Sequence, residues 1–335
     1  MKLSSTKWLL IVAVSTGLSV ALTGCGGGGA SAGAVTAPVT PPTAPAVTPA
    51  DLQTTNAVPS YDQASQAYAT YQLVQAMRGT AGVGYLIEDA ALTKSTANHL
   101  GYLLANTDLN LADIDPKTGA PLFHSEDPLR PQFTGATVQA RTSLTGYGGA
   151  FVTEVGSYGA SEGATRALRD LMATVYHRNI MLDQGIRNIG VAVGTNAAKT
   201  TVIDFGYKTT GQHVASDYVG NYPFDQQTGV PRSPTAESPN PYPAAVTSLG
   251  YPVSISAAAG TALSGVAITV TETGQTTALP VSYITNASDK AVPAHVAFAI
   301  PTVVLKPSTT YTVAAGFSVN GVAKTRSWSF VTAAS

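Results

Sequence analysis

The chain has 335 residues, of which 11% are charged and 7% aromatic, and its formal net charge is −1. Without the first 24 residues, 16 basic side chains would face 19 acidic ones and the net charge would be −3. That balance lacks the basic excess that a phosphate backbone demands, so we expect no nucleic-acid partner. The apolar content of 44% is too high for a wholly disordered chain. A single cysteine excludes an internal disulfide and any multi-cysteine metal site.

Residues 1–24 have the pattern of a secretory signal. Two lysines precede an apolar run that is short for a membrane span. The run ends in Leu-Thr-Gly-Cys at Cys25, which resembles the lipobox of bacterial lipoproteins. The resemblance implies cleavage before Cys25, acylation there and a lipid anchor in the bacterial cell envelope. Gly26, in place of aspartate, favours the outer membrane. The alternative is a plain secretory signal with an incidental cysteine.

Composition divides the rest of the chain into four parts. Residues 25–58 are rich first in Gly and then in Ala, Pro, Thr and Val, which is typical of a linker. Residues 59–213 have mixed helical and strand periodicity and are expected to form a domain. Residues 214–250 are proline-rich, with an irregular course predicted over 218–242. Residues 251–335 have an all-β pattern.

The elements expected in 59–213 are segregated rather than strictly alternating. This favours the α+β class over a doubly wound sheet. A long polar loop follows the second helix, and the last two strands are predicted to form a hairpin. Apolar periodicity predicts helices over 60–77, 89–106 and 161–176 and strands over 150–155, 188–195 and 200–207.

The C-terminal part reads as short strands joined by turns. Asn320-Gly321 is a strong hairpin signal because both turn positions tolerate positive φ. Trp328 and Phe330 alternate with serines, so one face of the last strand is expected to be buried. The region resembles bacterial Ig-like modules, which usually act as spacers or binding modules. Strands are predicted over 266–273, 278–284, 294–300, 311–319 and 323–331.

Three polar residues from distant segments could share a site. His124 lies in the long polar loop, Glu154 lies inside an otherwise apolar strand, and His177 ends the third helix. Asp170 and Thr174 lie on the same polar face of that helix as His177. Two imidazoles and a carboxylate can hold a divalent metal with a water molecule, or act as an acid–base set without one. The alternative is a set of scattered surface histidines.

The order of five motifs in 59–207 resembles the CAP superfamily. That superfamily includes cysteine-rich secretory, antigen 5, plant pathogenesis-related and bacterial SCP-like proteins. The stretch around His-Arg-Asn-Ile is the most specific part of the resemblance. The motifs are Met-Arg-Gly-Thr-Ala-Gly at 77–82, Phe-His-Ser at 123–125, Thr-Glu-Val at 153–155, Leu-Met-Ala-Thr-Val-Tyr-His-Arg-Asn-Ile-Met-Leu at 171–182 and Asn-Ile-Gly-Val-Ala at 188–192.

The resemblance implies an α-β-α sandwich with a central cleft that holds two histidines and two glutamates. His124, Glu154 and His177 match three of these positions. The second glutamate aligns with Thr174, which cannot replace it, and Asp170 lies one turn back as a partial substitute. This departure weakens a role for Glu154 as a catalytic acid or base. It leaves a two-histidine site for zinc or another divalent metal at His124 and His177.

The remaining signals favour structural roles. We expect His99 to be structural, His213 to be exposed, and His295 to be structural or exposed. Residues 159–163 fit the Gly-x-Ser-x-Gly pattern of a hydrolase elbow, but the linker has the same pattern at 29–33. Ser161 is therefore interpreted as the N-cap of the third helix.

Three functions remain open at this stage. The preferred one is a non-enzymatic envelope protein whose cleft binds a small molecule, a lipid or an envelope component, with or without a divalent metal. The second is a metal-dependent, protease-like hydrolase that uses His124, Glu154 and His177. The third is a structural surface protein with a vestigial cleft.

Overall fold

The computed structural model describes residues 47–158, 162–197, 199–242 and 248–334. Cys25 with its predicted lipobox, the predicted signal, most of the predicted linker and Ser161 lie outside these residues. The chain from Ala46 onward forms one compact unit. This unit holds helices and several small sheets, which confirms the α+β class. Within the part of the chain that the structure describes, no helix combines the length and apolarity needed to cross a membrane.

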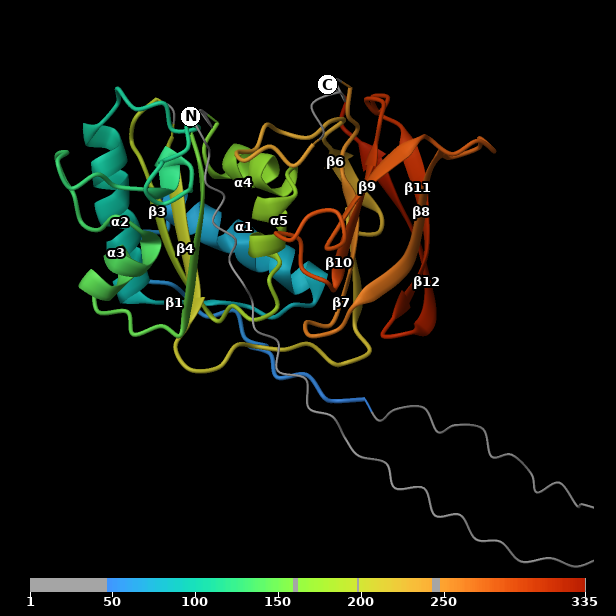
Figure 1. The fold of residues 1–335 in the computed structure, drawn as a ribbon, viewed down its shortest axis with the longest axis horizontal. Helices are drawn as coiled ribbons and strands as arrows, with labels where there is room; N and C mark the ends of the chain where they lie inside the picture. The colour runs from blue at the N-terminus through green and yellow to red at the C-terminus, as the bar shows by residue number, and fades with distance from the viewer. Residues whose placement is uncertain (1–46, 159–161, 198, 243–247, 335) are drawn as a thin grey trace, which may run out of the picture. The chain divides into compact units, whose positions relative to one another are not determined.

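A four-stranded sheet with helices on both faces forms the first half of this unit (Figure 1). Its strand order is β1-β3-β4-β2; β1 runs parallel to β3, and the other pairs are antiparallel. Helices α2 and α3 cover one face, and α1, α4 and α5 cover the other. The arrangement is an α-β-α sandwich. Its elements are α1 (Gln66–Ala81), β1 (Ile87–Glu88), α2 (Ala90–Ala105), α3 (Val138–Leu144), β2 (Phe151–Ser157), α4 (Ala164–Met172), α5 (Tyr176–Met181), β3 (Asn188–Val193) and β4 (Thr201–Tyr207).

Capping residues explain where the first two helices begin. Asp89 accepts a hydrogen bond from the backbone N–H of Ala91 and starts α2 at the predicted position. Helix α1 begins six residues later than predicted, because Ser65 caps it. A Cβ at Gly190 would overlap the backbone of the first turn of α2, so glycine lets this helix lie directly on β3.

The predicted third helix is two helices, which corrects the sequence analysis. Helix α4 ends at Met172, a turn follows, and α5 begins at Tyr176. The N-cap of α4 is Gly163, so the prediction of Ser161 as N-cap was wrong. The side chain of Gln66 from α1 accepts a hydrogen bond from the first N–H of α4 instead, at 2.8 Å. Helix α3 and the short strand β1 carried no recognised signal.

Two further four-stranded sheets follow, in the orders β5-β7-β10-β9 and β6-β12-β11-β8. The five predicted C-terminal strands are present, with Asn320 and Gly321 at φ 47° and 83° between the last two. The irregular course predicted for 218–242 was wrong in two places, because β5 and β6 lie there and join these sheets. The strands are β5 (Val219–Tyr222), β6 (Gln227–Val230), β7 (Val253–Ala257), β8 (Leu263–Glu272), β9 (Val281–Thr285), β10 (Val296–Pro301), β11 (Thr310–Val319) and β12 (Val322–Thr332).

Arg178 of α5 connects the helices to the C-terminal strands. Its guanidinium is buried over three aromatic rings, with its carbon 4.7 Å from the ring centre of Tyr222, 5.1 Å from that of Tyr251 and 5.5 Å from that of Phe298. It also donates a hydrogen bond to the carbonyl of Pro252 at 2.8 Å. Cation–π contacts of this kind are strongest where water is excluded. Helix α5 is thereby fixed against the strands that follow it.

Candidate functional site

The predicted cleft residues come together around one cavity of about 230 Å³ near the end of β2. Four of the five, His124, Asp170, Thr174 and His177, line it directly. Glu154 does not line the cavity, but its Oε1 contacts Nδ1 of His124. The prediction that a loop, a strand and a helix bring these side chains together therefore agrees with the geometry. The roles assigned to the residues stay predictions.

His124 is held in place by its own loop and by β2. It ends the short 3₁₀ helix η1 (Leu122–His124), and its side chain is 22% exposed. Its Nδ1 lies 2.8 Å from Oε1 of Glu154. The neighbouring Phe123 ring packs on Gly156 so closely that a Cβ at this glycine would overlap the ring. A glycine in β2 thus positions the loop that carries His124.

Glu154 is a buried carboxylate that is neutralised by an arginine. Nη2 of Arg141, from α3, donates to its Oε2 at 2.7 Å. Burial alone would raise the pKa of Glu154, but the charge of Arg141, followed by contributions from His99 and His124, lowers it well below its usual range. Glu154 is therefore ionised, with one oxygen on Arg141 and the other on His124. This occupation makes it a poor proton acceptor for a substrate.

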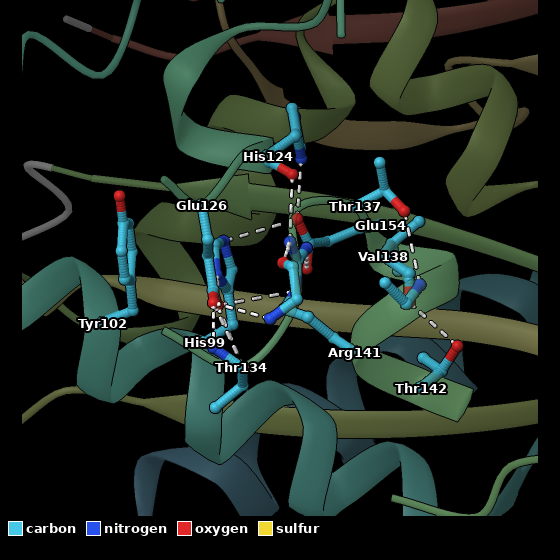
Figure 2. A network of polar contacts seen from close by, with 12 residues as sticks. His99, Tyr102, His124, Glu126, Thr134, Thr137, Val138, Arg141, Thr142 and Glu154 are labelled. Atoms are coloured by element: carbon cyan, nitrogen blue, oxygen red, sulfur yellow. Dashed lines mark hydrogen bonds and ion pairs between the residues drawn. The ribbon is translucent and has the colours of Figure 1, made fainter. Parts of the chain in front are cut away.

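A second histidine–glutamate pair lies deeper in the same network (Figure 2). His99 is fully buried, with Nδ1 2.9 Å from Oε1 of Glu126 and Nε2 2.7 Å from the carbonyl oxygen of Phe123. Glu126 also accepts backbone N–H groups from Thr134 and Gly135. Both ring nitrogens of His99 are thus occupied inside the protein. This agrees with the structural role expected for His99.

Asp204 pairs with Glu154 across β4 and β2, and it is fully buried. Neither of its carboxyl oxygens has a hydrogen-bond partner among the described residues. Burial and the charge of Glu154 raise the pKa of Asp204 well above its usual range. The raised pKa favours the protonated form of Asp204, which avoids a second negative charge beside Glu154.

His177 meets a residue that the sequence analysis missed. Its Nδ1 lies 2.7 Å from Oε1 of Glu237, which belongs to the proline-rich segment between β6 and β7. Thr174 is a weaker neighbour, with Oγ1 3.3 Å from Nδ1, because its hydroxyl donates to the Leu171 carbonyl. Glu237 is the lone acidic residue in 226–250. This isolated acidic residue in a proline-rich segment was the sequence signal that could have indicated Glu237.

Asp170 does not take the place of the missing glutamate. Its Oδ2 lies 2.6 Å from Nε of Arg166, one turn earlier on α4, so its carboxylate is already paired. It lines the cavity without contacting His177 by hydrogen bond. The expectation that Asp170 partly compensates for Thr174 is therefore corrected: the acidic neighbour of His177 is Glu237.

The two cavity histidines are arranged alike. Each binds a glutamate through Nδ1, and Nε2 of each has no hydrogen-bond partner in the described part of the chain. A histidine that ligates a metal commonly has this arrangement, with the second ring nitrogen on a carboxylate. The described residues contain no cluster of three or more His, Cys, Asp or Glu side chains able to hold a metal. The donor chemistry fits a divalent ion, but two ligands predict weak and exchangeable binding.

Neither a protein-family model nor a curated protein matches the chain. One similar solved structure is an outer surface protein from Borrelia burgdorferi, which is 15% identical. The match covers 44% of this chain and 96% of that chain, with a TM-score of 0.35. Similarity this low does not establish a shared fold or function. Membership of the CAP superfamily and the Ig-like resemblance therefore stay hypotheses drawn from the motifs.

Proposed function

We propose that the chain is a lipid-anchored envelope protein whose CAP-type cleft binds a small polar ligand between His124 and His177. One observation carries the binding role: two histidines from distant segments line one cavity, and each is oriented by its own buried glutamate. Orienting an imidazole in this way leaves Nε2 available to accept a hydrogen bond or to ligate a cation. The envelope anchor is inferred from the lipobox at Cys25.

Binding is a better proposal than hydrolysis. A hydrolase of the kind considered above needs Glu154 as a base near the reacting water. Glu154 is covered by His124 and Arg141, and its lowered pKa makes it a weak base. The two imidazoles line the cavity, and Nε2 of each has no hydrogen-bond partner among the described residues. A divalent cation such as Zn²⁺ is the first ligand to test, with water filling its other coordination positions.

Zinc titration of the mature protein by calorimetry tests this proposal. We expect wild-type protein to bind one Zn²⁺, and His124→Ala combined with His177→Ala to abolish that binding. His213→Ala is the matched control, because His213 is exposed and lies away from the cavity residues. A fragment screen by NMR on the same proteins then searches for organic ligands of the cavity. Unchanged zinc binding in the double variant, or no zinc or fragment binding by any of the proteins, would refute the proposed function.

The anchor is tested separately, in cells. Cys25→Ser should release the protein from the membrane fraction and abolish incorporation of a labelled fatty acid. Retention in the membrane fraction with no label in wild-type protein would argue for a plain secretory signal followed by another mode of attachment.

A further inference from the structure

The acidic partner of His177 comes from outside the region that carries the CAP motifs. Glu237 lies in the connecting segment between β6 and β7, and its carboxylate is completely buried. Its neighbours Thr235, Ala236 and Ser238 line the same cavity as His177. The segment therefore forms one wall of the cleft. The hydroxyl of Ser238 attaches it to the opposite wall by donating to the carbonyl of Ala112 at 2.9 Å.

Glu237 is bound by four donors that surround the beginning of α5. Its Oε1 accepts the backbone N–H groups of Tyr176 and His177, each at 2.9 Å, and its Oε2 accepts that of Val175 at 2.9 Å. The fourth donor is Nδ1 of His177, at 2.7 Å. The N–H groups of a first helical turn have no partner within the helix, so Glu237 satisfies donors that would otherwise be unpaired.

These contacts determine which nitrogen of His177 carries the proton. A carboxylate oxygen that already accepts two backbone N–H groups acts only as an acceptor, so Nδ1 must supply the hydrogen. In the neutral ring, Nε2 then bears the lone pair, and Nε2 is the nitrogen with no partner among the described residues. Both oxygens of Glu237 already accept backbone N–H groups, Oε2 from Val175 and Oε1 from Tyr176 and His177. Glu237 therefore stays an acceptor.

We propose that Glu237 is a positioning residue that fixes His177 in its Nδ1–H form and directs the Nε2 lone pair to the cleft. The role of His177 as a cleft ligand rests on the proposed function, but its ring orientation does not. The connecting segment is accordingly part of the site and not only a spacer. Binding at His177 depends on residues that follow β6, 60 positions further along the chain.

Ring-nitrogen NMR of the ligand-free mature protein tests this directly. Wild-type His177 should show a protonated Nδ1 and an unprotonated Nε2, assigned by comparison with His177→Ala. In Glu237→Ala the ring should shift toward the Nε2–H form that predominates for free histidine in water. A helix cap with no positioning role would lower stability but leave this pattern unchanged. Retention of the wild-type pattern in a folded Glu237→Ala protein would overturn the proposal.

A second variant covers the case in which the alanine variant does not fold. Glu237→Gln keeps the shape and one acceptor oxygen but removes the charge, so the Nε2–H fraction should rise measurably above that of wild type. No rise in Glu237→Gln would count against the proposal. Ser233→Ala is the matched control, since Ser233 lies exposed in the same segment and does not line the cavity, so the ring pattern should stay as it is.

Zinc affinity gives an independent readout. Loss of a carboxylate behind a metal-bound histidine typically weakens binding about 10- to 100-fold. We expect that loss in Glu237→Ala and wild-type affinity in Ser233→Ala. If wild-type protein binds no zinc, the proposed function loses its first ligand while the ring-nitrogen result still decides the role of Glu237. Equal zinc affinity in wild type and Glu237→Ala would contradict the positioning role.

Discussion

Each side of the cleft holds a histidine ring on a buried glutamate, but the two glutamates are stabilised in different ways. On one side, Glu154 orients His124 from a central sheet, with Arg141 buried beside it. On the other side, Glu237 orients His177 from a connecting segment, and backbone N–H groups take the place of the arginine. A buried carboxylate needs compensation in both cases. Glu154 is compensated by the charge of Arg141, whereas Glu237 is compensated by backbone N–H groups at a helix terminus. The two sides should therefore respond differently to mutation.

The largest expected effect comes from removing the positive charge of Arg141, which pairs with Glu154 next to His124. Arg141→Met leaves Glu154 buried without a cation and should lower the free energy of unfolding by about 3–5 kcal/mol, measured by urea denaturation. Arg130→Met is the control, because Arg130 pairs with the exposed Asp108 and should cost less than about 1 kcal/mol. Similar losses in both variants would mean that the buried arginine does not stabilise Glu154 as argued.

A steric change should disturb the same side with a smaller effect. Gly156→Ala places a Cβ on the Phe123 ring and should destabilise the protein by about 1–3 kcal/mol while displacing His124. Thermal unfolding and the NMR signals of the His124 ring measure the two consequences. Gly148→Ala serves as control, since nothing lies within 4 Å of its added Cβ. Unshifted His124 signals in Gly156→Ala would show that the loop does not depend on this contact.

Replacing Asp204 should change the stability of the protein in a pH-dependent way that distinguishes it from its ionised neighbour Glu154, whose pKa is lowered and not raised. The pKa of Asp204 is raised in the folded protein. Its contribution to the free energy of unfolding is therefore fully present below the pKa of the unfolded state, near about 4. That contribution is lost as the pH rises toward the pKa of the folded state. Asp204→Asn should therefore raise the free energy of unfolding above that of wild type at pH 7 and leave it unchanged near pH 4. Urea denaturation at both pH values checks this. A variant that is less stable at pH 7 would contradict a protonated Asp204.

The smallest effect is expected at the residue that the motifs align with a glutamate. Thr174→Val removes a hydroxyl whose main bond is to the Leu171 carbonyl, and it should cost about 0.5–1 kcal/mol. The ring-nitrogen pattern of His177 should not change, because Glu237 holds that ring. A tautomer shift in Thr174→Val would reverse the assignment and make Thr174 the residue that orients His177.

Local signals predicted much of the fold. Helix α2 was placed to within one residue because Asp89 is a capping residue followed by regular apolar spacing. The hairpin at Asn320-Gly321 was correct because its turn chemistry is contained in two residues. Helix α3 was missed because it has only seven residues and its buried side chains, Arg141 and Thr142, are polar, so no apolar periodicity marks it. Strands β5 and β6 were missed because the prolines around them mask four-residue strands.

The site was predictable only as far as its motifs reached. His124, Glu154 and His177 were found from the order of short sequence patterns, and the same patterns placed Thr174 beside them. Two residues that hold these side chains in place, Arg141 behind Glu154 and Glu237 behind His177, were not found. Arg141 lies on a helix without a recognised signal, and Glu237 meets His177 through a connection that only the packing of the later strands creates. Long-range pairing of charges is invisible to local periodicity.

The aromatic surroundings of Arg178 bear on how the protein can be divided for study. A fragment ending at residue 213, where the mixed α and β region was expected to stop, would lose Tyr222, Tyr251 and Phe298 together with the carbonyl of Pro252. The guanidinium would then be exposed to water amid apolar side chains whose covering had been cut away. Such a fragment should self-associate, so recombinant work on the cleft requires the later strands to be retained.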